Sequence, residues 1–257
     1  MHLLTIESTD STNNFVNSHA DDFPDMIAVM ALEQTAGRGQ RGNCWEAKPG
    51  ENITLSIMMR LKVNIAPTDQ FLLSQCVSVG VVETLRRYLP THKNEIAIKW
   101  PNDIYVGQRK ICGILIENSI TDGRIARTIA GIGLNVNQLR FESDAPNPVS
   151  MLQLTGKEHD IRGIAQFLCN TIEMFFKAYF NPPHYDRLRS RYFSMLWRRS
   201  GHHPYLDTAT GERFMARISN IASSGHITLT DTEERQRVYA FKEVKAVGLE
   251  PCPDKAL

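Results

Sequence analysis

Hydrophobic and polar residues alternate in some segments of the chain and follow a helical period in others. Alternating or β-branched runs predict strands at residues 3–7, 26–32, 53–59, 95–99, 104–106, 111–116 and 127–136. Helical spacing predicts helices at residues 15–20, 68–89, 160–180 and 185–199. Thr68 or Asp69 is expected to cap the second of these helices, and a hairpin is expected to turn at Gly107 and Gln108. Strands and helices mixed along the chain indicate an α/β domain.

The pattern changes near Gly201. Turn sequences at residues 208–212, 223–226 and 231–234 separate three short strand-like runs. These runs predict a small all-β unit of about 50 residues, which is marginal as an independent fold. We therefore predict a first domain at residues 1–200, with a mixed sheet and helices on one side, and a second domain at residues 201–257.

Composition narrows the class of protein. The 257 residues are 42% hydrophobic and 22% charged, which is ordinary for a globular protein that buries a core. A formal net charge of +1 gives no overall attraction to nucleic acid, and no apolar window approaches the length of a membrane span. Five cysteines without C-x-x-C spacing are typical of free thiols in a reducing compartment. We therefore expect a cytoplasmic protein with no membrane partner and no metal site made by the chain alone.

Residues 37–42 read GRGQRG and match the dinucleotide-binding pattern G-x-G-x-x-G. That pattern requires a helix immediately after the loop, but Pro49 and Gly50 interrupt the chain and a strand follows. A Rossmann interpretation is therefore rejected. Two alternatives remain: an exposed loop with solvated arginines, or a loop that folds over an anionic ligand with its amides and guanidinium groups.

Four polar segments stand where predicted strands end. Each has an ordinary explanation: Ser11 to Asn13 as a helix cap, Trp100–Pro101 as a turn, and Lys110 as a solvated hairpin lysine. Their order along the chain carries more information than any one of them. The segments are Ser11-Thr12-Asn13, residues 34–42, KWPND at residues 99–103 with Arg109 and Lys110, and GIGLN at residues 131–135.

Together these segments resemble the biotin protein ligase family. The resemblance rests on GRGxxG, KWPND, RK-x-x-GIL-x-E from Arg109 to Glu117, and GIGxN. It implies a class II synthetase-like catalytic domain followed by an SH3-like β-barrel. It also implies activation of biotin with ATP to biotinyl-5'-AMP and transfer of biotin to a lysine of a biotin carboxyl carrier protein domain. A lipoate-protein ligase or octanoyltransferase of the same fold is the alternative, and a non-catalytic binding module is the rival of another class.

Carboxylate activation by ATP needs positive charge around the α-phosphate and no enzyme nucleophile. Lys110 is the candidate that contacts both the carboxylate and the phosphate, and Arg38 is a candidate clamp. Asp103 either holds Mg²⁺ that accompanies ATP or orients Lys110. Trp45 has two interpretations of equal weight, as a surface for adenine or as a core residue.

The resemblance implies two sets of binding residues. Biotin is expected to contact Ser11, Thr12, Asn13, Gln34, Gly37, Arg38, Lys110 and Gly113. The nucleotide is expected to contact Arg38, Gly39, Gln40, Arg41, Trp45, Asn102, Asp103 and Asn135.

Two departures from the family pattern stand out. Gln40 occupies a position where an arginine is usual, so either Arg41 substitutes or the adenylate is held less tightly. Larger members carry an N-terminal helix-turn-helix domain, whereas here the resemblance begins at Leu3, so we expect neither that domain nor sequence-specific DNA binding.

Three further expectations concern mobility, charge and assembly. The glycines predict a loop at residues 37–49 that is mobile alone and ordered by ligand. The arginines at residues 187–199 form either a solvated helix face or a nucleic-acid patch, and the first interpretation is favoured. The oligomeric state, monomer or homodimer, stays open.

Overall fold

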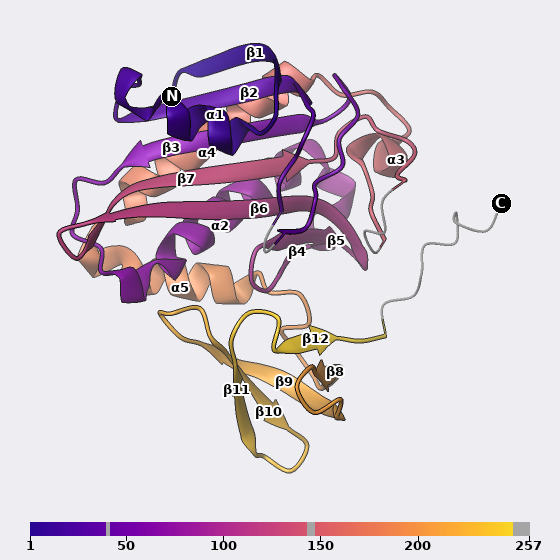
Figure 1. Cartoon of the computed structure of the whole chain (residues 1–257). Coiled ribbons are helices and arrows are strands. Elements are labelled where there is room, and N and C mark those ends of the chain that lie inside the picture. Colours follow the sequence, from indigo (N-terminus) through magenta and orange to yellow (C-terminus); the bar gives the residue numbers. More distant parts are fainter. Residues whose placement is uncertain (40–41, 143–146, 249–257) are drawn as a thin grey trace.

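The computed structural model describes residues 1–39, 42–142 and 147–248, which fold around two β-sheets (Figure 1). The strands of the larger sheet are β1 (Leu3–Thr9), β2 (Met26–Gln34), β3 (Ile53–Arg60), β4 (Ile96–Lys99), β5 (Asp103–Val106), β6 (Arg109–Thr121) and β7 (Arg124–Leu134). Their order is β1-β2-β3-β7-β6-β5-β4, with β1 and β2 parallel and the other neighbours antiparallel. All seven predicted strands are confirmed, and β6 extends further than predicted.

The helices follow the predicted order with differences at their ends. They are α1 (Thr12–Ser18), α2 (Phe71–Tyr88), α3 (Met151–Thr155), α4 (Ile161–Tyr179) and α5 (Tyr185–Ser194), with 3-10 turns at Ala20–Asp22, Pro67–Asp69, Pro90–His92 and Pro182–His184. The predicted cap at Thr68 or Asp69 is wrong, because both residues belong to a 3-10 turn and Gln70 precedes α2. Helix α3 was not predicted, although Ser150 and Gln153 form a capping box that the sequence contains.

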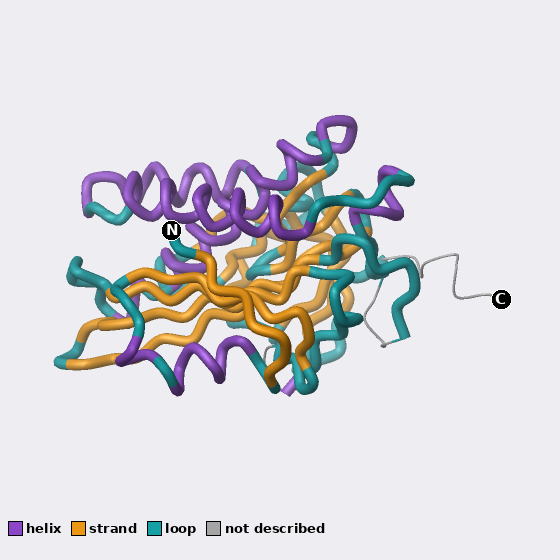
Figure 2. The backbone as a smooth tube through the Cα atoms, turned by 90° about the horizontal axis from the view of Figure 1, so that it is seen from above, coloured by secondary structure: helices purple, strands orange, loops and turns teal. Residues whose placement is uncertain are grey.

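The helices cover the two faces of the large sheet unequally. Figure 2 shows the long helices on one face and the short α1 on the other. Strand alternation explains this division: Ala28 and Met30 belong to the core under α2, α4 and α5, whereas Val29 packs with Val16 of α1 and with Met58. The mixed α/β class is confirmed, and α1 is the exception to the expectation of helices on one side.

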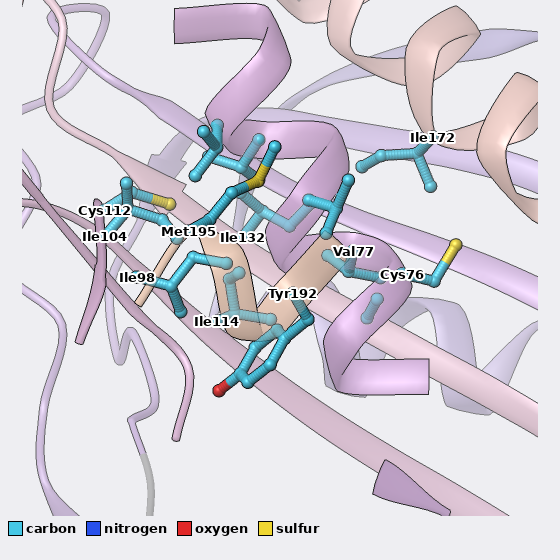
Figure 3. Close-up of a cluster of buried hydrophobic side chains, with 14 of the residues drawn as sticks. Cys76, Val77, Ile98, Ile104, Cys112, Ile114, Ile132, Ile172, Tyr192 and Met195 are labelled. Carbon is cyan, nitrogen blue, oxygen red and sulfur yellow. The ribbon is translucent and has the colours of Figure 1, made fainter. Parts of the chain in front are cut away.

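The main core lies between the sheet and the long helices (Figure 3). Val77 of α2 and the strand residues Ile114 and Ile132 are at most 4% exposed. Tyr192 of α5 is fully buried, and its hydroxyl group donates to the carbonyl oxygen of Pro101 at 2.8 Å. The core is therefore tied directly to the KWPND segment, whose Trp100–Pro101 peptide bond is cis.

The second sheet follows α5. Its strands are β8 (His203–Asp207), β9 (Arg213–Ile221), β10 (Ile227–Asp231), β11 (Gln236–Tyr239) and β12 (Val244–Ala246), in the antiparallel order β11-β10-β9-β8-β12. The described residues form an open sheet and not the closed barrel that was expected, because β11 and β12 at its two edges do not pair. The division into domains 1–200 and 201–257 stays a prediction, since both sheets contribute to one cavity.

Trp100 joins the two sheets. Its indole Nε1 donates to the carbonyl oxygen of Gly225 at 2.9 Å, and its ring centroid lies 5.3 Å from that of Phe241. Phe241 in turn lies 5.9 Å from Phe71 of α2. A residue predicted only as part of a turn therefore anchors the C-terminal sheet to the KWPND segment.

The structure also tests the expectations for the arginine-rich segment, the cysteines and membrane spans. Arg189 pairs with Asp69 at 3.2 Å and Arg191 with Glu83 at 3.0 Å, so part of the predicted solvated arginine face is ion-paired. The cysteines at 44, 76, 112 and 169 are free thiols as expected, and Cys252 lies outside the described residues. No helix in the described part of the chain is long and apolar enough to cross a membrane.

Candidate active site

Parallel pairing of β1 and β2 brings the first two predicted segments together. Both strands end at the same edge of the sheet, and Thr9 pairs in register with Gln34. The chain leaving β1 enters α1 beside Gln34, whose Oε1 accepts from Thr12 N at 2.8 Å and from Thr12 Oγ1 at 3.0 Å. Ser11 occupies the predicted N-cap position of α1, but its side chain makes no cap bond.

Ser56 of β3 completes this polar group. Its hydroxyl donates to Asn13 Oδ1 at 2.6 Å and lies 2.7 Å from Thr12 Oγ1. Ser56 is fully buried and Asn13 is 3% exposed. Sequence reasoning missed Ser56, although a lone serine inside the apolar run of residues 53–59 was an available signal.

Three glycines leave the sheet bare on the face that carries α1. Gly113 pairs with Gly133 across β6 and β7, and Gly131 pairs with Ser56 across β7 and β3. A Cβ atom added at Gly131 would lie 2.5 Å from Asn13 Oδ1. These glycines therefore create a trough that side chains from other elements enter.

The glycine-rich loop folds back toward this trough. Gly39 N donates to Asn43 O at 2.6 Å, and Trp45 N donates to Gly37 O at 2.9 Å, so the two arms run antiparallel. Gly37 does not line the cavity. It permits the close approach of the arms, because a Cβ atom there would lie 2.5 Å from Trp45 O. Gln40 and Arg41 lie outside the described residues.

Trp45 lies in the trough. A Cβ atom added at Gly133 would lie 2.2 Å from Trp45 Cε2, and one at Gly113 would lie 2.9 Å from Trp45 Cζ3. Lys110 Nζ lies 5.6 Å from the centre of the indole ring. The buried indole Nε1 has no hydrogen-bond partner among the described residues. Trp45 therefore forms part of the cavity wall, between Lys110 and the bare sheet.

Lys110 and Asp103 form an ion pair on the same wall. Lys110 Nζ lies 2.7 Å from Asp103 Oδ1, and the side chains are 23% and 25% exposed. An irregularity between Ile104 and Tyr105 shifts the register of β5 against β6, so that Tyr105 stands opposite Lys110. The ion pair between Lys110 and Asp103 agrees with the hypothesis that Asp103 orients Lys110.

A second ammonium group lies nearby. Lys99 Nζ donates to Tyr105 Oη at 3.1 Å. Burial lowers the pKa of Lys99, Asp103 opposes this shift, and the nearby cations Lys110 and Arg198 add to it. The wall therefore holds two ammonium groups and one carboxylate within a small region, which suits an anionic ligand.

Arg38 contacts protein acceptors. Its Nη2 lies 2.8 Å from Glu117 Oε1, and its Nη1 donates to Asn14 Oδ1 at 2.6 Å. Glu117 Oε2 also accepts from Asn13 Nδ2 at 2.7 Å. Sequence reasoning placed Glu117 in a family motif but assigned it no role.

These groups surround a cavity of about 950 Å³ between the two sheets. The predicted site residues in its wall are Ser11, Thr12, Asn13, Gln34, Arg38, Gly39, Trp45, Asn102, Asp103, Lys110, Gly113 and Asn135. The C-terminal sheet adds Tyr205 and Lys245, and the turn before β12 adds Lys242; none of the three was predicted. The cavity therefore offers an apolar trough at one end and donors or cations around it.

Two predicted asparagines have different surroundings. Asn102 is 5% exposed and donates to the carbonyl oxygen of Ile114, which fixes the KWPND turn on β6. Asn135 is 3% exposed and donates to Val149 O at 3.1 Å, while its buried Oδ1 has no partner within the described ranges. Asn135 thus lines the cavity with an oxygen atom that receives no hydrogen bond from the described residues.

Metal-binding groups are sparse. The described residues contain no group of three or more His, Cys, Asp or Glu side chains that could hold a metal ion. Asp103 is a wall carboxylate, and it is already paired with Lys110.

Comparison with known proteins assigns the family. The family model for the biotin/lipoate A/B protein ligase family matches residues 5–137. The chain belongs to this family.

Within the matched segments, about a third of the residues are identical between this chain and its curated relatives. The bifunctional ligase/repressor BirA of Bacillus spizizenii is 32% identical over 187 residues, which cover 69% of this chain and 54% of the relative. A biotin--[acetyl-CoA-carboxylase] ligase of Mycobacterium tuberculosis is 31% identical over 175 residues, covering 66% of this chain and 62% of the relative. The chain thus spans about half to two thirds of the length of these relatives.

Solved structures support the fold. The biotin protein ligase from Aquifex aeolicus in complex with biotin and ATP superposes with a TM-score of 0.75 and 19% identity, over 96% of this chain and 99% of that one. This similarity extends the assigned fold through the C-terminal sheet.

Proposed function

We propose that this chain activates biotin with ATP to give biotinyl-5'-AMP, and then transfers biotin to a lysine of a biotin carboxyl carrier protein domain. The observation that carries the proposal is the Lys110–Asp103 pair at 2.7 Å, on the wall of the cavity that also holds the polar group around Gln34. Family membership and the similarity to proteins named biotin ligases support the same conclusion.

In the first step, a carboxylate oxygen of biotin forms a bond to the α-phosphorus of ATP, and pyrophosphate leaves. Negative charge accumulates on the phosphate oxygens, so cations fixed beside them lower the barrier. Lys110 is suited to contact both reacting groups, with Asp103 holding its ammonium in place. Arg38 adds a guanidinium fork from the loop. In the second step, the amine of the carrier lysine attacks the acyl carbon and AMP leaves.

Each part of the cavity suits one part of the ligands. The hydroxyl and amide groups of Ser11, Thr12, Asn13 and Gln34 match a polar ureido head, and the trough at Gly113 accepts an apolar ring. Asn135, whose Oδ1 receives no hydrogen bond from the described residues, serves the nucleotide side. The remaining proposed ligand contacts are Gly39, Gln40, Arg41, Trp45 and Asn102, whereas Gly37 is proposed to shape the loop without contacting the ligand.

Mg²⁺ is proposed to accompany the ATP phosphates near Asp103. Mg²⁺ is commonly held by one or two carboxylates together with phosphate oxygens, so a single carboxylate fits this role. The proposed partner is a biotin carboxyl carrier domain in the cytoplasm, and DNA and membranes are not expected partners.

Biotin-dependent exchange of pyrophosphate into ATP tests the proposal directly. Lipoate and octanoate serve as parallel substrates, because the family includes lipoate enzymes. Exchange with biotin alone, followed by labelling of a carrier domain but not of its lysine-to-arginine variant, is the expected result. Exchange with lipoate and not with biotin would favour a lipoate-protein ligase, and no exchange with any acid would contradict both ligase functions.

A further inference from the structure

Glu117 links the two halves of the candidate site. Its Oε2 accepts from Asn13 Nδ2 at 2.7 Å on the proposed biotin side, and its Oε1 lies 2.8 Å from Arg38 Nη2 on the proposed phosphate side. Asn13 comes from α1 and Arg38 from the glycine-rich loop, so one carboxylate of β6 joins two separate elements. We propose that Glu117 is a positioning residue that fixes the binding orientation of Asn13 and Arg38 together. This inference rests on the function proposed above.

The contact fixes which way the Asn13 amide points. An ionised carboxylate only accepts hydrogen bonds, so the NH₂ group of Asn13 must face Glu117. The amide oxygen is then directed to Ser56, which donates to it at 2.6 Å. A Cβ atom at position 131 would overlap Asn13 Oδ1, so Gly131 leaves the space that the amide occupies on the sheet side. Without Glu117, no carboxylate would oppose the flipped orientation of Asn13, in which the amide oxygen and the NH₂ group exchange places.

The contact between Glu117 and Arg38 also holds the guanidinium group at the cavity. The guanidinium group has five N–H donors in a planar fork, and Glu117 and Asn14 engage one donor on each terminal nitrogen. The remaining donors are available to an anionic ligand without removal of the guanidinium from Glu117. Arg38 and Glu117 are 45% and 36% exposed, and pairs this exposed contribute little to folding stability. The effect of Glu117 is therefore expected in binding and rate more than in stability.

Alanine at position 117 tests the inference through coupling. Glu117→Ala is expected to weaken biotin binding about tenfold in calorimetry and to lower the exchange rate about tenfold, which are the sizes expected for lost charge-assisted hydrogen bonds. In an Asn13→Ala background the effect on biotin affinity should disappear, and in an Arg38→Ala background the effect on rate should disappear. A merely structural role would leave the effects multiplicative in both backgrounds.

Two further variants complete the experiment. Glu83→Ala removes a 28%-exposed carboxylate that pairs with Arg86 and Arg191 away from the cavity, and it should leave biotin affinity and exchange unchanged. Glu117→Gln can accept from one of its two partners but carries no charge, so an intermediate loss is expected. It replaces the alanine variant if that protein does not fold.

Two outcomes separate the inference from the proposed function. The first outcome is a wild-type protein that exchanges pyrophosphate, with Glu117 variants that behave like wild type or whose effects multiply fully with those of Asn13→Ala and Arg38→Ala. This outcome would overturn the positioning role alone. A wild-type protein that neither binds biotin nor exchanges pyrophosphate would overturn the proposed function and this inference with it.

Discussion

Removal of the Lys110 ammonium should abolish most adenylate formation while the protein stays folded. In the folded protein, Lys110 Nζ lies 2.7 Å from Asp103 Oδ1 and faces the cavity that holds the other candidate residues. Alanine at this position removes the charge and leaves Asp103 without its partner. The consequence for rate and the consequence for stability have different magnitudes, which makes the experiment decisive.

Both magnitudes follow from the environment of the pair. Lys110 and Asp103 are 23% and 25% exposed, so screening by solvent limits their contribution to folding to about 1 kcal/mol. A loss of that size from a total of roughly 5–15 kcal/mol leaves nearly all molecules folded. A charge contact made in the transition state is worth about 10²–10³ in rate. The rate should therefore fall far more than the folded fraction.

Pyrophosphate exchange with saturating biotin and ATP measures the rate, and thermal unfolding monitored by circular dichroism measures the folded fraction. Lys62→Ala is a matched control, because Lys62 Nζ lies 2.8 Å from Asp25 Oδ2 in a lysine–aspartate pair away from the cavity. Exchange by that control should equal the wild-type rate. Lys99→Ala compares the second wall ammonium.

Near-normal exchange in Lys110→Ala would refute the assignment. If Lys99→Ala then loses activity instead, the catalytic cation is the partly buried ammonium that donates to Tyr105. A Lys110→Ala protein that unfolds at the assay temperature would refute the stability reasoning. The ion pair would then contribute far more to folding stability than its exposure indicates.

Three other results are expected. Gly133→Ala should place a methyl group in the trough, where its Cβ would lie 2.2 Å from Trp45 Cε2. Because the methyl group takes space from the ligand ring, the KM for biotin should rise about tenfold and tryptophan emission should shift, and an unchanged KM and spectrum would contradict this packing. Burial alone would raise the pKa of Asp231, but bonds from the Arg235 backbone and side chain hold it at about 2, below the usual 3.8. This carboxylate therefore stabilises the fold above pH 3.8, and that contribution is lost as the pH falls through about 2; Asp231→Asn should flatten the dependence of Tm on pH in this window, and an unchanged profile would count against it. Amide hydrogen exchange across residues 37–49 should slow when biotin and ATP are both added, and equal protection with and without them would contradict the prediction that ligand orders this loop.

Local pattern was enough to predict most elements, because strand alternation and helical spacing are properties of neighbouring residues. The seven strands of the large sheet were all predicted from runs such as residues 53–59. Element ends were less predictable: α5 ends at Ser194, before the predicted position 199. Helix α3, only five residues long, has too few turns for a period to emerge, and its capping box was the sole available signal.

Site residues were identified by motif, but their contacts depend on tertiary structure. No local pattern reveals that the register shifts between Ile104 and Tyr105, and this shift accompanies the pairing of Lys110 with Asp103. The contact between Asn13 and Glu117 spans 104 positions and requires β3 and β7 to lie between β2 and β6. Likewise, Trp100 matches a turn motif, yet its bond to Gly225 is visible only when the second sheet is in place.

The glycine-rich loop connects these observations into one expected motion. Its far end is anchored, because Gln138 is fully buried, donates to Glu46 Oε1 at 2.9 Å and accepts from Lys48 N at 3.1 Å. The chain is therefore held in place at Glu46 and Lys48, directly after Trp45. Trp45 stands at the boundary and lies over the bare glycines of the sheet. We expect a ligand ring that enters the trough to displace the indole, and the indole to move the adjoining chain with it. Occupation of the trough and closure of the loop over the nucleotide are then coupled through a single side chain.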